Sequence, residues 1–550
     1  MALGPDADRG AQRRRGRPLR LPEDHRPFAS DTVDCDARVA WAVLTNRLLH
    51  PDQRLRERAA VVEGLAQEGV AADPSRLSRW ESGQQQIPLR VLLGYERVLR
   101  LPALSLLTVT RCIRRVAGVA GGDIDDPRVY AEDARRHGRD LETLLEEIYE
   151  GEEVGGDAWL GLSALLGSFD RVFLPRQTWE RLSDRLLREL ARTAGVDHRR
   201  RMEACMLVMA HPQGQRHLLQ ALGRWLVDPH VQLAGPLIGL LQAIDSPTAS
   251  RLVMQLLGAP VRQVREGASA IAAAKLRGGH FAPDDLERLE AHARMRLVAS
   301  GSLHDVVDAL DLLAHLPQEL ADRTLAVVRG ARRRAVLLAR EQALLVPAGK
   351  AVGIASEIAE AAQSRVRSVL GERPDPMLGR LVREALFHVH YPRRDAAARL
   401  LAVSPFRDGL ADATLDAVQH PDALVASQAW QLAFRLGHGG RPDDVLPIVL
   451  AEKRPEIRAE GLVGLGLGRG TLSAAEQETV VDLAHAESNG RVRDGALFAL
   501  GMRGPEGLAR LSVPSEANDP ETVAAARWWR QLGGHLVDED AWPVPQRGCS

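Results

Sequence analysis

Apolar residues recur at spacings of three and four along most of the chain. Clear examples are Leu141, Leu144, Leu145 and Ile148, then Leu182, Leu186, Leu187 and Leu190, then Val306, Val307, Leu310 and Leu313. This spacing places the apolar side chains on one face of an α-helix. Glycine and proline interrupt the pattern as they do at helix ends. Because aromatic residues make up only 4% of the chain and β-branched runs are few, we predict an all-α fold.

The C-terminal part of the chain repeats one helical pattern. Four segments begin at His420, Arg454, Asn489 and Asp519, with aligned apolar positions at Val425, Ile457, Val492 and Val523, spaced 32, 35 and 31 residues apart. Val231 and Val264 show the same pattern, 33 residues apart. A period in the low thirties is typical of helical arrays whose units bury their apolar faces against neighbours. The pattern Pro-x-(x)-Val-Arg-x-x-Ala-x-x-Ala-Leu-Gly resembles the short bacterial HEAT repeat, which implies an α-solenoid.

Charge changes sign in steps along the chain. The net charge is -1, so any attraction for nucleic acid must come from a local patch. Residues 9–20 contain six arginines and no acid, residues 36–115 hold 13 arginines against 8 acids, and residues 123–157 hold 13 acids against 4 arginines. From these steps we predict five parts: a basic disordered arm (1–35), a small basic helical domain (36–122), an acidic connector (123–157), the HEAT-like repeats (158–540) and a C-terminal tail (541–550).

The most specific pattern in the chain is DPSRLSRWESGQQQIPLRVLLGYERVLRLP, at residues 73–102. Asp73 suits an N-cap, and a proline follows it at the first helical position. Leu77 and Trp80, three residues apart, are expected to face inward. Gly83 is expected to end this helix.

Residues 36–102 resemble the domain of phage-repressor/Cro-type (XRE-like) helix-turn-helix regulators. In that family a Ser-rich helix ends in Ile/Trp-Glu-x-Gly, and a helix that starts with proline follows, as at Pro88. The second helix of the motif is expected at residues 54–67, and its join to Asp73 is longer than the tight turn of the family. The resemblance implies double-stranded DNA as a partner.

The resemblance places the base-reading helix at residues 73–82. The residues that it implies for DNA binding are Ser75, Arg76, Ser78, Arg79, Gln84 and Gln85. Arginine can donate two hydrogen bonds to O6 and N7 of guanine, and the glutamines could reach phosphate oxygens as uncharged donors. The alternative for each position is an ordinary solvated helix face.

The N-terminal tail carries RRRGRPLR at residues 13–20. Its core Arg15-Gly16-Arg17-Pro18 resembles an AT-hook, in which the glycine lets the backbone lie deep in a narrow minor groove and Arg15 and Arg17 extend along its floor. Two alternatives remain open, a phosphate-binding arm without sequence preference and a disordered tail without function.

Motifs for chemistry are weak elsewhere in the chain. The glycines at residues 464–470 imitate a dinucleotide loop, but no apolar strand precedes them, which favours close helix packing. His388 and His390 are not four residues apart and suit a helix end. The four cysteines form no C-x-x-C pair, and no Ser/His/Asp arrangement is local. We therefore expect no catalytic residue, no cofactor and no metal site, and no enzyme.

The chain lacks an N-terminal apolar stretch, and its longest low-charge stretch, residues 229–244, is shorter than the ~20 residues of a spanning helix. We expect a cytoplasmic, nucleoid-associated bacterial protein without a membrane partner.

The leading hypothesis is a sequence-specific DNA-binding transcriptional regulator. Its helical repeats would sense a ligand or a protein partner, or would mediate self-association. One alternative is a protein-interaction scaffold that uses the helix-turn-helix fold for docking or dimerisation, and another is a HEAT-like DNA-processing enzyme. The acidic connector could fold back and compete with DNA, or it could be a plain linker. A fragment ending near Gly122 is expected to fold alone.

Overall fold

The computed structural model describes residues 20–151, 153–244, 246–299, 301–366, 375–437, 442–468, 470–515 and 518–536. All regular elements in these ranges are helices, and the two β-bridges there, Leu344–His388 and Ser515–Asn518, are isolated. The all-α prediction is confirmed for this part of the chain. No helix within these ranges combines the length and the apolar character that a membrane crossing needs.

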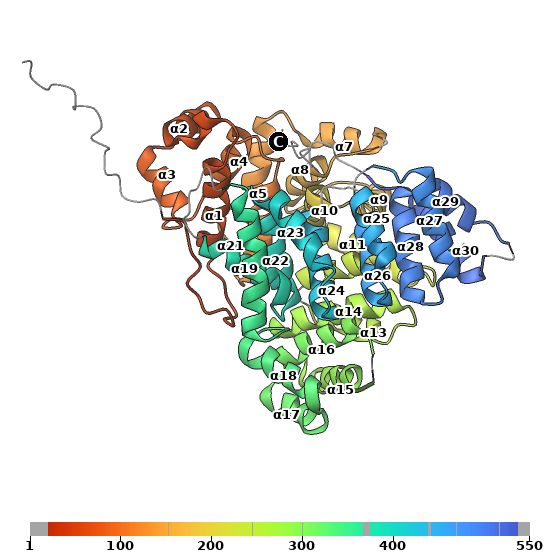
Figure 1. Ribbon diagram of the computed structural model, residues 1–550. Helices are drawn as coiled ribbons and strands as arrows, with labels where there is room; N and C mark the ends of the chain where they lie inside the picture. The colour runs from red at the N-terminus through yellow and green to blue at the C-terminus, as the bar shows by residue number, and fades with distance from the viewer. Residues whose placement is uncertain are drawn as a thin grey trace, which may run out of the picture.

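The N-terminal domain contains five α-helices and one 3-10 turn (Figure 1). They are α1 (Cys35–Leu48), η1 (Gln53–Arg56), α2 (Arg58–Gln67), α3 (Pro74–Glu81), α4 (Leu89–Val98) and α5 (Ser105–Val116). Two helices, α6 (Pro127–Arg136) and α7 (Leu141–Glu150), follow in the acidic segment.

The helices that follow α7 form a first row, which leads away from the N-terminal domain. Its members are α8 (Gly156–Gly167), α9 (Arg176–Ala191), α10 (Gly195–Ala210), α11 (Pro212–Leu226), α12 (Gly235–Ile238), η2 (Gly239–Ala243), α13 (Pro247–Leu256), α14 (Arg262–Arg277), α15 (Pro283–Ala299), α16 (Leu303–His315), α17 (Gln318–Val327) and α18 (Gly330–Gln342). The even-numbered helices pack in order from α8 to α18, with η2 between α10 and α14.

A second row returns along the first. Its members are α19 (Ala348–Ser364), α21 (Pro376–Phe387), α22 (Tyr391–Ala402), α23 (Arg407–Ala417), α24 (Ala423–Leu436), α25 (Pro442–Ala451), α26 (Pro455–Gly466), α27 (Ala474–Ala486), α28 (Gly490–Arg503), α29 (Pro505–Leu511) and α30 (Pro520–Leu532). The helices α24, α26, α28 and α30 pack in order. They carry the four aligned repeat positions Val425, Ile457, Val492 and Val523, all of which are buried.

The glycines that imitate a dinucleotide loop lie partly within α26 and serve its packing. A Cβ on Gly464 would lie 2.5 Å from the Phe434 ring, and one on Gly466 would lie 2.6 Å from the Phe498 ring. The absence of side chains at these positions therefore lets α26 approach α24 and α28 closely.

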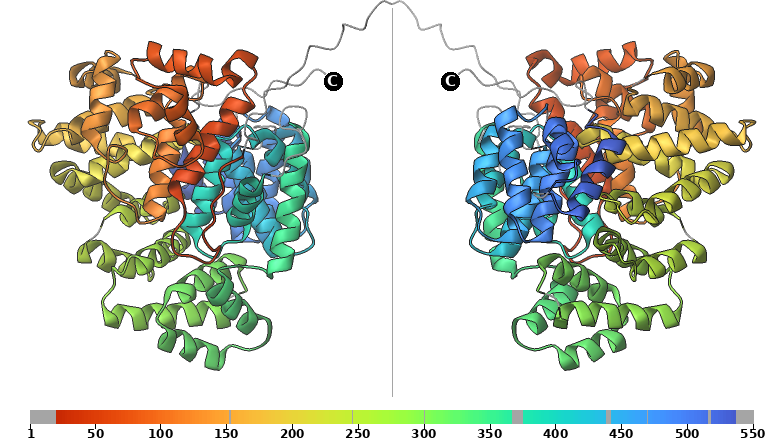
Figure 2. Two further views of the ribbon diagram at one scale, coloured as in Figure 1. Left: turned by 90° about the vertical axis from the view of Figure 1, so that its left-hand side faces the viewer. Right: turned by 90° about the vertical axis from the view of Figure 1, so that its right-hand side faces the viewer.

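The two rows lie side by side, with α15, α17 and α18 at the bend (Figures 1 and 2). Arg262 pairs with Asp494, and Arg491 pairs with Glu266 at 2.6 Å. The N-terminal domain contacts both rows through α5, which packs against α10 of the first row and α22 of the second. The N-terminal domain therefore bridges the two rows.

The first helix of the N-terminal domain docks on the second row through buried polar groups. Arg38 donates two hydrogen bonds to Glu384, at 3.2 and 2.7 Å, and Arg393 donates to the same carboxylate at 2.7 Å. The indole Nε1 of Trp41 donates to Asp375 at 2.9 Å. All these side chains are buried, so the domain shares its interior with the helical rows.

Residues 20–34, which we assigned to the disordered arm, lie against the second row. Asp24 accepts a hydrogen bond from Arg38 at 2.8 Å, and Arg380 donates to the carbonyl oxygens of Asp24 and Arg26 at 2.9 and 2.7 Å. Because these residues take part in the buried network around Arg38, the expected arm boundary at residue 35 is too far along the chain.

Candidate functional site

The helix α3 begins and ends where the sequence predicts. The side chain of Asp73 accepts hydrogen bonds from the backbone N–H groups of Ser75 and Arg76, at 2.8 and 2.9 Å. Gly83 follows the helix with φ of +71°, and a Cβ there would lie 3.0 Å from the Cα of Ala37 in α1. Both the left-handed backbone and the close approach favour glycine at this position.

The inner face of α3 is fixed by one buried carboxylate. Arg47 of α1 donates to both oxygens of Glu81, Arg58 of α2 donates to it at 3.3 Å, and the hydroxyl of Tyr95 in α4 lies at 3.3 Å. Glu81 is 1% exposed. This residue therefore ties α3 to three other helices of the domain.

The outer face of α3 holds the residues that the sequence predicts for DNA binding. Leu77 and Trp80 face inward and are buried. Ser75, Arg76, Arg79, Gln84 and Gln85 are exposed, and Ser78 is half-buried. Arg15 and Arg17 lie outside the described residues.

The guanidinium groups on this face differ in their partners. Arg76 lies 3.7 Å from Asp73, whereas the guanidinium of Arg79 makes no hydrogen bond or salt bridge within the described part of the chain. Among the described residues, the main packing contacts of α3 are with α1 and α2, and the side chains on its outer face are exposed. In Figure 1, α3 lies at the outer edge of the molecule.

The second helix begins later than predicted. Residues 53–56 form the 3-10 turn η1, Glu57 is extended, and α2 starts at Arg58 rather than Arg54. Arg47 donates from its guanidinium to the carbonyl oxygen of Arg56. This tertiary hydrogen bond stabilises the turn and displaces the start of the helix.

The acidic segment contacts the N-terminal domain away from α3. Asp133 pairs with Arg97, Glu132 pairs with Arg90 at 2.6 Å, and Asp125 pairs with Arg114 at 3.0 Å. These arginines belong to α4 and α5. Glu132 and Asp133 thus hold α6 against α4, and none of the ion pairs given for the described acids of this segment involves the outer face of α3.

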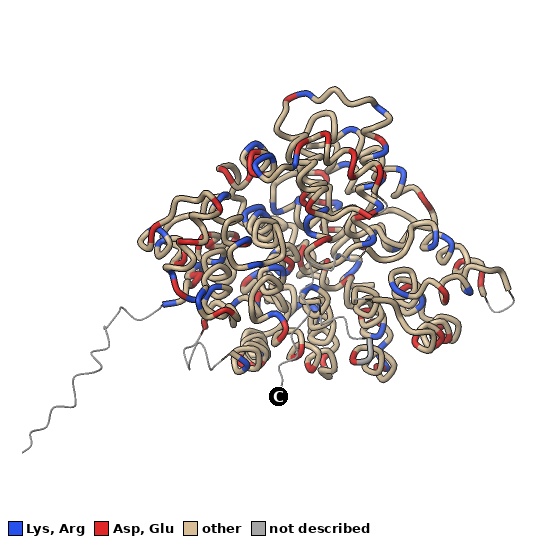
Figure 3. Tube along the Cα trace, turned by 90° about the horizontal axis from the view of Figure 1, so that it is seen from above, with Lys and Arg blue, Asp and Glu red and all other residues tan. Residues whose placement is uncertain are grey.

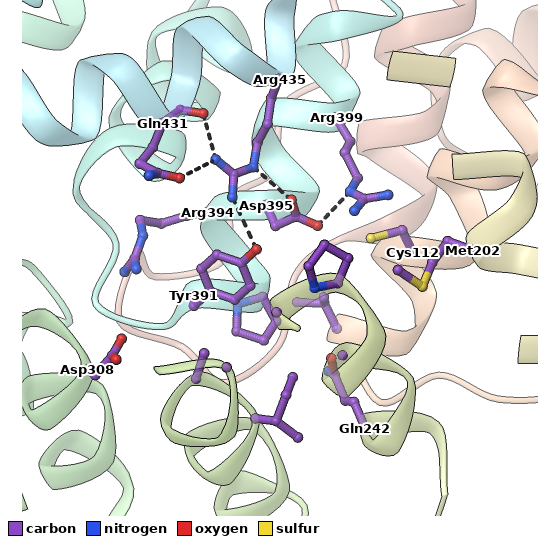
Figure 4. A pocket seen from close by; sticks show the side chains of 18 of the residues that line it. Cys112, Met202, Gln242, Asp308, Tyr391, Arg394, Asp395, Arg399, Gln431 and Arg435 are labelled. Carbon is purple, nitrogen blue, oxygen red and sulfur yellow. Dashed lines mark hydrogen bonds and ion pairs between the residues drawn. The ribbon is translucent and has the colours of Figure 1, made fainter. Parts of the chain in front are cut away.

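A cavity of about 360 Å³ lies where α5 meets the two rows. Its wall comes from α5, α10, α14 and α16 on one side and from α22 and α24 on the other. Figure 4 shows Arg399, Arg435 and Tyr391 gathered around Asp395, with Arg394 and Asp308 farther to the left. This volume falls within the ~300–1,000 Å³ that is typical of small-molecule sites.

Arginines of α22 and α24 surround one carboxylate at this cavity. Arg399 donates to Asp395 at 2.5 Å, and Arg435 donates to it at 2.8 Å. Burial would raise the pKa of Asp395, but the two guanidinium groups hold that pKa at about 2. Arg435 also donates to Tyr391 at 3.2 Å and to Gln431. Asp395 is therefore ionised at neutral pH.

Two further groups on the cavity wall have shifted pKa values. Burial raises the pKa of Asp308 to about 7, against the opposing charge of Arg296. Burial alone would lower the pKa of His304, but Glu460, at 3.2 Å, raises it to about 9. At neutral pH, His304 is thus positively charged, and the pKa of Asp308 lies far above that of an ordinary carboxyl group.

A separate cluster lies beside the cavity and could hold a metal ion. Asp311, His315 and His390 offer ligand atoms within 4.8 Å of one another, a donor set that suits Zn²⁺ or Fe²⁺. However, Asp311 already lies 3.0 Å from Nδ1 of His390 and accepts from the backbone N–H of Tyr391 at 2.9 Å. We interpret the cluster as a hydrogen-bonded network that joins α16 to the α21–α22 turn.

Sequence reasoning missed the cavity, although part of its signal is visible. Tyr391, Asp395 and Arg399 are four residues apart and so share one face of a helix. Arg435 follows 36 residues after Arg399, and nothing local indicates that the two would meet. No protein-family model and no curated protein matches this chain.

Proposed function

We propose that this protein is a sequence-specific DNA-binding regulator of transcription, with the outer face of α3 as its base-reading surface. The observation that carries the proposal is the exposed Arg79, which forms no salt bridge with any described residue, on a helix that Glu81 fixes from within. A fixed helix that presents such an arginine meets the geometric need of bidentate contact with guanine.

The distribution of charge agrees with a local rather than a global interaction. Basic and acidic positions are interspersed over the whole fold (Figure 3), and the net charge is -1. DNA affinity must then come from α3, its flanking glutamines and the N-terminal arm. The two helical rows would sense a ligand or a partner, or mediate self-association.

The test begins with the full chain and a library of random duplexes, from which bound sequences are selected and read. Arg79→Ala should weaken binding to the selected site by ~1–3 kcal/mol and relax the preference at one base pair. The control is Arg323→Ala, an exposed arginine on α17 at the far end of the molecule. Affinity is measured by titration at fixed salt.

Two outcomes would go against this proposal. If Arg79→Ala left both affinity and selected sequence unchanged, α3 would not be the reading helix. If the full chain enriched no duplex, the scaffold alternative would replace the regulator. The docking of α1 on Glu384 and Asp375 favours that second candidate, because the domain already uses one face for contact with protein.

The proposed HEAT-like DNA-processing enzyme has less support. Such an enzyme needs a nucleic acid to lie along the inner helices of the array. The facing rows leave a cavity of about 360 Å³ there, which suits a small molecule rather than a duplex.

A further inference from the structure

The cavity between the rows has more positive than negative groups at its α22–α24 wall. Arg399 and Arg435 share the single carboxylate of Asp395. Arg394, also on this wall, forms no salt bridge with any described carboxylate, and it donates only from Nη1, to the carbonyl oxygens of His388 and Val389 at 2.6 Å each. Two guanidinium groups therefore share one carboxylate, and Arg394 lies on the other side of Tyr391 (Figure 4).

The carboxylates on and near the opposite wall do not balance the excess positive charge at the α22–α24 wall. Glu203 is paired with Arg115, and Glu266 is paired with Arg491. Asp308 is only partly ionised at neutral pH because burial raises its pKa to about 7. Each full carboxylate near the cavity thus already has a cationic partner.

Donors remain available inside the cavity. Arg399 uses Nε for Asp395, and neither of its Nη atoms makes a hydrogen bond within the described ranges. Its side chain keeps 18% of its surface accessible, although it lies in the interior between α5, α10 and α22. A salt bridge whose role was only structural would be expected to satisfy these donors.

The remaining wall has apolar side chains between its polar ones. It includes side chains from α5, α10, α14 and α16, namely Val116, Met202, Met206, Ile271 and Val307. Methionine adapts its shape to a ligand more readily than branched side chains do. A ligand here would meet cationic groups at one end and a flexible apolar surface at the other.

We propose that this cavity binds a small organic anion, with its carboxylate or phosphate group against Arg399 and its apolar body against the methionines, of which Met202 lies beside Arg399 in Figure 4. Arginine suits both head groups because its planar donors match two oxygens at once. The binding of this anion does not depend on the proposed DNA-binding function.

The test uses the thermal unfolding of the full chain with three ring compounds at equal ionic strength: benzoate, phenyl phosphate and uncharged benzamide. Ligand that binds the folded chain raises the unfolding temperature with concentration. We expect benzoate or phenyl phosphate, or both, to raise it, and benzamide to leave it nearly unchanged. The stronger of the two anions identifies the head group.

Arg399→Gln should weaken the effective anion by about tenfold or more, because it removes charge-assisted donors. Arg323→Gln, on exposed α17, should keep the full effect. The proposal is wrong if neither anion exceeds benzamide, or if a folded Arg399→Gln variant binds as tightly as the natural chain.

Crystals of the unaltered chain soaked with 4-bromobenzoate and 4-bromophenyl phosphate give a test that needs no variant. A bromine position in the cavity, with the head group on Arg399, supports the proposal. Bromine found elsewhere, or at no defined position, overturns it.

Discussion

Two carboxylates in the N-terminal domain are buried in opposite surroundings. Glu81 lies against the guanidinium groups of Arg47 and Arg58. Glu96 instead accepts three backbone N–H groups at the start of α5, from Leu104, Leu106 and Leu107. Burial raises the pKa of Glu96 to about 7, although these three hydrogen bonds act in the opposite direction. Burial thus outweighs both the cap and the more distant charge of Arg200, since Glu96 forms no salt bridge with any described arginine.

The stability of the protein should therefore depend on pH through Glu96. The pKa of Glu96 in the folded state, about 7, lies above its ordinary value of 4.5, so the folded chain retains a proton that the unfolded chain loses between these values. The stabilisation is complete below pH 4.5, falls as pH rises to about 7, and is constant above that. Glu96→Gln should remove up to about 3 kcal/mol of this dependence.

The free energy of unfolding in urea is measured at pH 5 and pH 8 for the natural chain and for Glu96→Gln. Glu57→Gln, at an exposed position in the same domain, is the control and should follow the natural chain. If the free energy of unfolding changed equally with pH in the natural chain and in Glu96→Gln, then Glu96 would have the same pKa in the folded and the unfolded state. The prediction would then be wrong.

Local chemistry explains which of these residues could be predicted. Asp73 and Gly83 act through neighbouring backbone atoms, so their roles follow from the sequence around them. Glu81 acts through Arg47, which is 34 residues away. Its contacts depend on how α1 packs, and the sequence around α3 contains no sign of them.

At the scale of elements, the apolar spacing locates α7, α9 and α16, which contain the three segments that show it most clearly, and tertiary contacts set the exceptions. The start of α2 is displaced by the contact between Arg47 and Arg56. The acidic segment, expected as a connector or an inhibitor of DNA binding, forms α6 and α7, which pack against α8. Its acids pair with arginines of α4 and α5, and the charge steps in the sequence do not specify which helices of the basic domain they meet.

The docking of α1 predicts that the N-terminal domain is not self-sufficient. Trp41 is fully buried, donates to Asp375 and stacks on Phe406 of the second row at 6.0 Å. A fragment of residues 20–122 exposes this surface. Because it loses both the apolar burial and the hydrogen bond, we expect it to unfold about 10 °C or more below the full chain.

Trp41→Gln distinguishes docking from ordinary core packing. In the full chain it should cost ~3–5 kcal/mol in urea unfolding, while the fragment should change little. The prediction is wrong if the fragment is as stable as the full chain, or if Trp41→Gln destabilises the fragment as much as it destabilises the full chain. Either result would show that α1 packs in a core formed by the N-terminal domain alone. A fragment ending near Gly122 would then fold independently, as the sequence pattern alone predicts.

At the scale of the whole molecule, the repeat period indicates which helices are neighbours but not how the rows close. Val425, Ile457, Val492 and Val523 each pack within one unit or the next. The contact between Arg262 and Asp494 joins residues 232 positions apart. Whether these two residues meet depends on the rotation between successive units, summed over all the units that separate them. Small differences between the repeats change that sum. The cavity lies between the two rows that such contacts join and is therefore beyond prediction from local pattern.

The arrangement of the whole chain also defines how the basic arm should be tested. Residues 20–34 hold Asp24 against Arg38, so deletion must stop at residue 19 to leave the fold intact. The deleted segment contains five arginines and two acids. For each phosphate that the arm neutralises, its deletion should lower the slope of log affinity against log salt by ~0.9. We therefore expect deletion of residues 1–19 to weaken binding to all duplexes and to flatten the salt dependence, with unchanged thermal stability.

Replacing Arg15 and Arg17 together by alanine separates the two DNA-binding alternatives for the arm. An AT-hook would lose a preference for A·T-rich flanks, because its two arginines lie along the floor of the narrow minor groove. A phosphate-binding arm would lose only part of the salt slope, because its other arginines still neutralise phosphates. An unchanged slope after the full deletion would mean that the arm does not touch DNA, and that α3 and its flanking residues supply the whole electrostatic contribution.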